Sequence, residues 1–329
     1  MTKFSVLDLA PIVQGSTPRQ ALKNSVNLAQ HAEQLGYHRY WVAEHHNMRG
    51  IASAATSVLI GHIAENTHSI RVGSGGIMLP NHAPLMVAEQ FGTLEALYPG
   101  RIDLGLGRAP GTDGLTAQAL RRTLNSDPNH FPQDVIELKA YLGDIQEQQK
   151  VCAVPGYGSN TPLYILGSSL FGAQLAAILG LPFAFASHFA PAAMEQALAI
   201  YRREFEPSAQ LEEPYVILGF NICCADTQDE ASLLRTSGLR AFLNLRLGTP
   251  GLLPPPIEDF EANLSPAEQS LLTQVSAAST VGDSAKVRAD ASQFIAETGA
   301  DELIVVAQIF DHAARVHSYE LAIEACSEL

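Results

Sequence analysis

Cysteine is scarce in this sequence and has none of the spacings of a disulfide or zinc framework. Four cysteines occur among 329 residues, at positions 152, 223, 224 and 326. They include no C-x-x-C pair and no Cys/His spacing of the zinc kind, so we expect neither a disulfide-stapled fold nor a structural zinc site. Ordinary thiols of this kind suit a reducing compartment, and we expect a cytoplasmic location.

Positive charge is also scarce. The chain has 20 lysines and arginines against 34 aspartates and glutamates, which gives a formal net charge of -14 at pH 7. Such a surface repels phosphate backbones and anionic lipids. We therefore expect no nucleic-acid partner and no membrane partner, and instead a small-molecule substrate.

Long apolar runs and a leader pattern are missing as well. The most apolar segment, Ala176 to Ala186, is shorter than a bilayer span requires. The first residues, "MTKFSVLDLAP", show no basic region followed by an apolar stretch of signal-peptide length. Both observations agree with the expected cytoplasmic location.

Short apolar runs alternate with helix-period segments throughout the chain. Eight runs predict strands: 4–10, 40–43, 70–78, 101–107, 162–167, 182–187, 215–224 and 301–310. Each precedes a predicted helix: 18–35, 52–65, 84–97, 134–148, 170–179, 191–205, 229–247 and 312–328. Eight such units predict an α/β fold, a (β/α)8 TIM barrel, formed as a single domain by residues 1–329.

Two connections are longer than a minimal barrel needs. The proline-rich stretch Gly248 to Phe260 and a further helix from Asp283 predict insertions before the eighth strand. A second irregular stretch, from "APGTDG" through "SDPNHFPQ", follows the fourth strand. Long connections in a compact domain commonly form lids or binding loops.

The second strand ends in "EHHN", which places Glu44, His45 and His46 at the mouth of the barrel. Neighbouring strand residues point to opposite faces, so only one histidine faces the mouth, and Glu44 shares the side of His46. This geometry disfavours a metal site made of the two adjacent histidines, and we expect no metal ligands. The histidine at the mouth either transfers protons or only bonds neighbouring loops.

The fourth strand ends in "GLGRAPG", which nearly matches a dinucleotide fingerprint but has Pro110 in place of the third glycine. A Rossmann site is therefore not expected. Gly107 lets a ligand approach the backbone, and Arg108 either binds a phosphate or pairs with a carboxylate. Ser168 and Ser169 begin the fifth helix, where they either hold an anion or simply cap the helix.

The third strand contains "GSGG", in which Ser74, Gly75 and Gly76 offer almost no side-chain bulk. This stretch is either a plain turn or a surface on which a flat ring can stack. Leu7 and Asp8 end the first strand at the same mouth. We include all five residues among the candidates for contacting a cofactor.

The segments "YWVAEHHN", "VGSGGIMLPNHAPLMVAEQFGTLEALYPGRIDLGLGRAPG" and "VGDSAKVRADASQFIAETGADELIV" together resemble the bacterial luciferase-like monooxygenase family. The resemblance keeps the motif order along nearly the whole chain. It implies a (β/α)8 barrel that receives reduced FMN from a separate flavin reductase and reacts it with O2 to form a flavin hydroperoxide. That intermediate then oxygenates a small organic substrate.

The resemblance also implies roles for particular residues. His45 matches the family's active-site histidine, and Glu44 would orient the motif by hydrogen bonds. Arg108 matches its flavin-phosphate arginine and Ser169 a phosphate-binding serine. The bond between Gly75 and Gly76 falls where the family has a non-proline cis peptide. A homodimer is implied as well, and we expect its interface to involve the predicted helices 52–65 and 84–97.

One departure from the family concerns Gly107, which stands where the light-emitting catalytic subunit has a reactive cysteine. Light emission and a long-chain aldehyde substrate are therefore not expected. Two alternatives to the monooxygenase stay open: a flavin carrier without turnover, and a deazaflavin-dependent hydride-transfer enzyme. A metal-dependent hydrolase is disfavoured by the geometry of the adjacent histidines.

Overall fold

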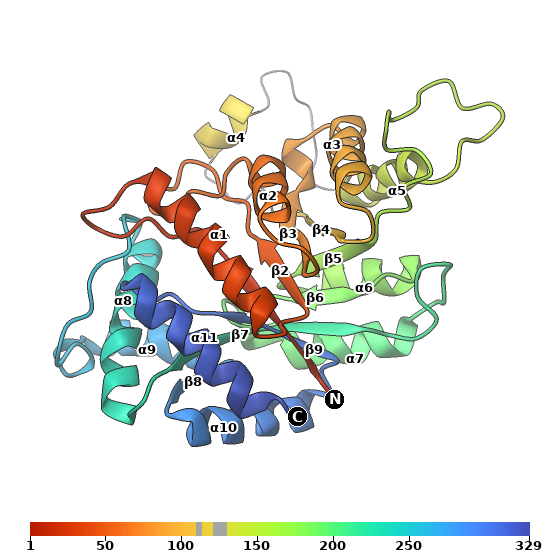
Figure 1. Cartoon of the computed structure of the whole chain (residues 1–329). Coiled ribbons are helices and arrows are strands. Elements are labelled where there is room, and N and C mark those ends of the chain that lie inside the picture. The colour runs from red at the N-terminus through yellow and green to blue at the C-terminus, as the bar shows by residue number, and fades with distance from the viewer. Residues whose placement is uncertain (110–113, 121–129) are drawn as a thin grey trace.

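The chain forms a closed barrel of parallel strands wrapped by helices (Figure 1). The computed structural model describes residues 1–109, 114–120 and 130–329. Within these residues, eight strands close a ring, and the predicted (β/α)8 barrel is confirmed. In ring order they are β1 (Lys3–Asp8), β2 (Arg39–Val42), β3 (Arg71–Met78), β4 (Ile102–Gly107), β5 (Leu163–Gly167), β6 (Phe183–Phe185), β7 (Val216–Cys224) and β9 (Glu302–Val306).

A further strand, β8 (Ser279–Gly282), lies outside this ring. It pairs with the C-terminal half of β7, whereas the N-terminal half of β7 pairs with β6 and β9. The insertions predicted before the last barrel strand are confirmed, and they also contain helix α9 (Pro266–Ser276). Sequence reasoning missed β8 because four residues are too few to show a strand pattern.

Helices cover the outside of the ring and begin at polar caps. Thr17 caps α1 (Pro18–Gln34) and Asp311 caps α11 (His312–Cys326), each accepting a hydrogen bond from a backbone N–H of the first turn. No helix within the described residues combines the length and apolar character needed to cross a bilayer. The other helices are α2 (Thr56–Glu65), α3 (Pro84–Leu97), α4 (Gly114–Leu120), α5 (Phe131–Leu142), α6 (Leu170–Leu179), α7 (Met194–Glu204), α8 (Gln228–Arg246) and α10 (Ser284–Thr298).

Most predicted helices differ from the observed ones only at their ends. The largest difference is α5, which was predicted over 134–148 but ends at Leu142, because Gly143 leaves the helical conformation. The irregular stretch predicted after β4 contains the short helix α4. Residues 110–113 and 121–129 of that stretch lie outside the described part of the chain.

Charged side chains close the N-terminal end of the barrel interior. Arg39, the first residue of β2, donates hydrogen bonds of 2.8 Å to both Asp103 of β4 and Glu302 of β9. Arg71 of β3 also pairs with Asp103. An apolar layer fills the middle of the barrel, formed by Leu7, Trp41, Ala43, Tyr164, Ala184, Ile217, Ile304 and Val306.

The main apolar core lies between the strands and the surrounding helices. The two chain ends meet on the N-terminal side of the barrel (Figure 1), where the Thr2 N–H donates to the Leu329 carbonyl at 2.9 Å. Parallel strands bring all their C-terminal ends to the opposite side, which is where active sites of this fold lie.

Candidate active site

A cavity of about 810 Å³ opens at the C-terminal ends of the barrel strands. Three predicted site residues, Asp8, Glu44 and Ser74, do not line it. The other predicted residues do, and they come from the ends of five strands: Leu7, His45, Gly75, Gly76, Gly107, Arg108, Ser168 and Ser169. The fold therefore gathers most of the predicted site into one space.

Gly75 and Gly76 of β3 give the cavity a bare stretch of wall. Their peptide bond is cis, as the family resemblance implied. A β-carbon on Gly76 would lie 2.7 Å from the carbonyl oxygen of Gly105, and one on Gly75 would lie 2.6 Å from Leu7 Cδ1. Neither position has room for a side chain, so both must be glycine, and they line the cavity with backbone alone.

His45 lines the cavity just beyond the end of β2, together with Ala43. The two residues that alternate with them, Glu44 and His46, do not line it. The prediction that only one of the adjacent histidines faces the barrel mouth is therefore confirmed. His45 is half-buried, which leaves its imidazole able to meet a ligand within the cavity.

A second histidine, His188, lines the same cavity after β6 and was not among the predicted site residues. Its ring packs on the backbone of Gly219 in β7, and Asn221 donates a 2.6 Å hydrogen bond to its carbonyl oxygen. Burial, and then the nearby His45, lower the pKa of His188 to about 4. Its position at the end of the run "FAFASHF" was the signal that could have identified it.

A cradle for an anion forms at another part of the wall. Arg108 follows β4 and stacks its guanidinium over the ring of Phe171, 4.2 Å from its centroid. Among the described residues, no carboxylate pairs with Arg108. Ser169 precedes α6 as its N-cap residue, but its side chain makes no capping hydrogen bond. Arg108, Ser168, Ser169 and the amino end of α6 thus offer positive charge and donors to an anion.

Asp8 and Ser74 point away from the cavity into packed parts of the barrel. The Asp8 carboxylate pairs with Arg315 at 2.7 Å and accepts a 2.6 Å hydrogen bond from Tyr40. Although burial raises the pKa of Asp8, Arg315 and these hydrogen bonds lower it below its usual value. Ser74 donates to the carbonyl oxygen of Gly105 at 2.9 Å. Both side chains therefore connect elements of the barrel.

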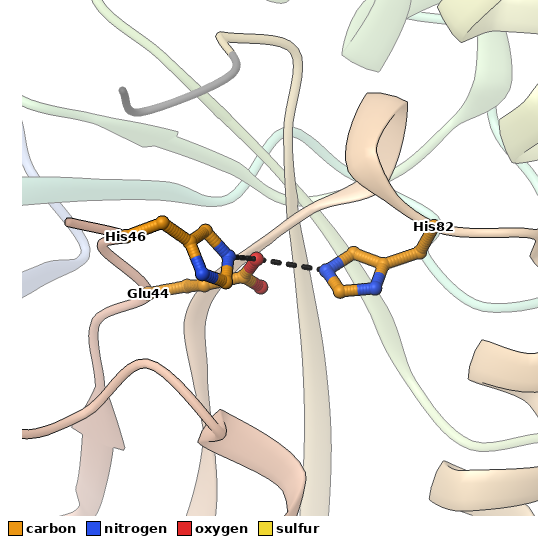
Figure 2. Close-up of side chains that lie close together, drawn as sticks. All are labelled: Glu44, His46 and His82. Atoms are coloured by element: carbon orange, nitrogen blue, oxygen red, sulfur yellow. Dashed lines mark hydrogen bonds and ion pairs between the residues drawn. The ribbon is translucent and has the colours of Figure 1, made fainter. Parts of the chain in front are cut away.

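Glu44 lies behind the cavity wall in a cluster with two imidazoles (Figure 2). Its Oε1 atom lies 2.6 Å from Nε2 of His46 and 2.7 Å from Nε2 of His82, while Oε2 accepts a hydrogen bond from the Met78 N–H. Burial raises the pKa of Glu44, but the hydrogen bonds from His82 and His46 lower it below its usual value. Sequence reasoning missed His82 because it follows the next strand rather than the "EHH" motif.

The cavity fits a flat ring that carries an anionic arm. The bare glycine wall suits the ring, and the anion cradle around Arg108 and α6 suits a phosphate. The Nδ1 atom of His188 is buried and has no hydrogen-bond partner among the described residues, so it is a polar group left for a ligand. These are observations on the chain itself, and they agree with the flavin that the resemblance implied.

Solved structures share this fold, among them one in complex with FMN and one that is F420-dependent. The structure of apo-MsnO8 matches with a TM-score of 0.89 at 36% identity, over 100% of this chain and 99% of that one. A second match, with a TM-score of 0.74 at 19% identity, is the oxygenating constituent of 3,6-diketocamphane monooxygenase from Pseudomonas putida in complex with FMN. It covers 100% of this chain and 98% of that one. An F420-dependent secondary alcohol dehydrogenase matches with a TM-score of 0.71 at 15% identity, over 99% of both chains.

Sequence comparison extends the likeness beyond the fold. A luciferase-like monooxygenase of Escherichia coli K12 is 57% identical over 326 residues, which are 99% of this chain and 97% of that protein. The family model for luciferase-like monooxygenases matches residues 2–323. This chain belongs to the luciferase-like monooxygenase family.

Proposed function

We propose that this protein is a flavin-dependent monooxygenase that uses reduced FMN and O2 to oxygenate a small organic substrate. One observation carries the proposal: a single cavity joins the bare glycine wall, the anion cradle and His45. In the overall reaction one oxygen atom enters the substrate and the other leaves as water. Reduced FMN supplies two of the four electrons and the substrate supplies the other two.

The anion cradle would hold the phosphate of FMN. Arg108 supplies a permanent charge, and Ser168, Ser169 and the free N–H groups of α6 supply hydrogen bonds. Gly75 and Gly76 line the cavity with backbone alone, and the ring would lie against it. When bound and reduced, FMN supplies the electrons that activate O2.

His45 is the residue that we expect to transfer protons. Its imidazole lies on the cavity side of the "EHH" motif, and an imidazole titrates near neutral pH in the absence of other influences. Glu44 holds the neighbouring His46 on the opposite side and so fixes the direction of the motif. His188, whose pKa is lowered to about 4, stays neutral at physiological pH and offers a hydrogen bond without a charge.

The substrate would occupy the part of the cavity along α8. One face of this helix lines the space with Gly238, Leu239 and Phe242, flanked by Arg235 and Arg246, and Ile51 and Leu253 extend the apolar part of this wall. Such a wall excludes water from the reacting groups and favours an apolar substrate. Because α8 and the following insertion form this wall, they rather than the shared strand ends would determine which substrate is accepted.

The first test is to mix the purified protein anaerobically with reduced FMN, admit O2, and follow the absorbance. An absorbing species distinct from both reduced and oxidised FMN supports oxygen activation on the protein. Binding followed by reoxidation as fast as that of free FMN, with or without candidate substrates, favours the carrier instead. If only a deazaflavin binds, the hydride-transfer alternative gains and the monooxygenase proposal fails.

We also propose that a separate reductase delivers the reduced FMN and that the protein is a homodimer. The exposed apolar side chains of α2 and α3 support the dimer, because Val58 is 72% exposed and Met86 is 58% exposed. A second copy would cover both. Analytical ultracentrifugation should find a dimer at micromolar concentration and a monomer for Met86→Asp, and a monomeric wild type would contradict the proposal.

A further inference from the structure

We propose that Glu44, His46 and His82 form a binding site for one divalent transition-metal ion of the zinc type. The carboxylate oxygen and the two imidazole nitrogens lie within 4.8 Å of one another (Figure 2). Two imidazoles with one carboxylate are a ligand set that binds Zn²⁺ in proteins. The sequence-based expectation of no metal ligands considered only His45 and His46, and it did not include His82.

The fold brings these three ligands together from two adjacent strands. Glu44 and His46 follow β2 and point to the same side, because alternate residues share a face. His82 follows the short 3-10 helix η1 (Leu79–Asn81), which continues from the end of β3. Since β2 and β3 are neighbours in the ring, their C-terminal ends place His82 opposite His46, with Glu44 between them.

The carboxylate is prepared to act as a ligand. Glu44 is almost completely buried, and the Met78 N–H holds its Oε2 atom at 3.1 Å. Its Oε1 atom remains directed at both imidazoles. A metal-bound carboxylate oriented by a backbone donor is a common arrangement of protein metal sites. Together with two neutral imidazoles, the charge of the carboxylate would leave a bound divalent ion with one net positive charge in a chain of net charge -14.

The side chains must adjust to admit an ion between the three ligand atoms, which lie within 4.8 Å of one another. Zn²⁺ binds nitrogen and oxygen ligands at about 2.0–2.2 Å, so tetrahedral ligand atoms lie roughly 3.3 Å apart. The two N···O separations of 2.6 and 2.7 Å would therefore widen by about 0.6 Å. The side chains of His46 and His82 are 14% and 30% exposed, which gives an ion access from solvent.

The ligand types select among metals. Mg²⁺ and Ca²⁺ prefer sites made of oxygen atoms, so two imidazoles disfavour them. Three protein ligands leave a fourth position open to water. The ion would lie on the side of the motif opposite His45, so it would fix the segment that carries His45 without entering the cofactor cavity. This inference does not depend on the proposed flavin chemistry.

The test is a Zn²⁺ titration of tag-free, chelator-treated protein in competition with a chromogenic zinc chelator. We expect one equivalent to bind, and His82→Ala to weaken binding by at least about 100-fold, more than the loss of an outer-shell partner does. His46→Ala should have the same effect. The matched control is His62→Ala, which removes an exposed histidine of α2 and should leave the affinity unchanged.

Two results would overturn the site. Wild-type protein that binds Zn²⁺ no more tightly than His82→Ala shows that the cluster is only a hydrogen-bonded brace. Tight binding that survives both substitutions places the ion elsewhere. Circular dichroism establishes that each variant is folded, and if His46→Ala is not, the comparison of His82→Ala with His62→Ala decides the question.

Discussion

The two ends of the barrel interior differ in whether their arginine side chains are paired with carboxylates. At the N-terminal end, Arg39 is buried and reaches two carboxylates, Asp103 and Glu302. At the C-terminal end, Arg108 faces a cavity, and no carboxylate among the described residues pairs with it. The same residue type is thus fully paired at one end and available to a ligand at the other.

The difference extends to the other groups at each end. Trp41, Tyr164 and Tyr215 add hydrogen bonds to the carboxylates at the N-terminal end, so its charged groups are satisfied, although the buried Ser5 Oγ has no partner among the described residues. At the C-terminal end, glycines leave backbone uncovered, and Nδ1 of His188 is buried without a partner among the described residues. Unsatisfied groups reduce stability and are retained where a ligand completes them. The N-terminal end therefore stabilises the fold, and the C-terminal end is prepared for binding.

The largest expected effect on activity comes from His45→Ala. Loss of a positioned proton donor or acceptor should reduce substrate oxygenation by about 100- to 10,000-fold. The free energy of unfolding should change little, because His45 lies at the cavity and not in the core. The measurements are turnover with reduced FMN and O2, and urea denaturation. Wild-type turnover in a variant that binds FMN would remove the proposed role, and His62→Ala serves as the control.

The largest expected effect on stability comes from the opposite end, with Arg39→Met. The substitution leaves the buried charge of Glu302, and part of the charge of Asp103, without a neighbouring cation. It should therefore lower the free energy of unfolding by about 3–5 kcal/mol. Urea denaturation measures this loss. The exposed pair Arg288–Glu328 provides the control, since Arg288→Met should cost less than about 1 kcal/mol. Equal losses in both variants would contradict the contrast between buried and exposed pairs.

Arg108→Gln should weaken binding of FMN by roughly 10- to 100-fold, the value of a hydrogen bond to a charged group. Riboflavin, which has the same ring without the phosphate, should bind the variant and the wild type equally. Equilibrium titrations with both ligands separate loss of the phosphate contact from damage to the ring site. An equal loss of riboflavin affinity would show that Arg108 does not act on the phosphate, or that the substitution distorts the site.

A smaller effect distinguishes His188 from Asp103 by the pH at which each contribution to stability is lost. The folded pKa of His188 is about 4, below the ordinary value of 6.5, so the unfolded chain binds a proton between these values that the folded protein does not. Its contribution to stability is therefore complete above pH 6.5 and is lost as the pH falls toward 4. His38 and His312 act in the same direction.

Asp103 at the N-terminal end responds at lower pH. Burial raises the pKa of Asp103, but Arg39 and Arg71 lower it below 3.8, so its contribution is lost only below that value. Thermal midpoints measured from pH 7.5 to pH 3 test both ends. His188→Asn should lose less stability than the wild type between pH 6.5 and 4, and identical curves would show that His188 is not buried as a neutral group.

The sequence by itself determined the barrel and most of the cavity wall. Eight apolar runs, each followed by a helix-period segment, predict parallel strands whose ends meet on one side. Position at a strand end was enough to place His45, Gly75, Gly76, Arg108 and Ser169 at the cavity, as the structure has them. Alternation along a strand also predicted that Glu44 would face away from His45. These patterns involve residues close together in the sequence, so local steric preferences are enough to determine them.

Only the tertiary structure decided which side chains meet. Asp8 ends a strand like the other candidates, yet it turns to Arg315, 307 positions away, because a buried carboxylate is most stable beside a cation. His82 joins Glu44 because β2 and β3 are neighbours, and His188 joins His45 across the cavity because the ring closes. Periodicity shows whether a residue faces inward or outward, but long-range packing selects its partners.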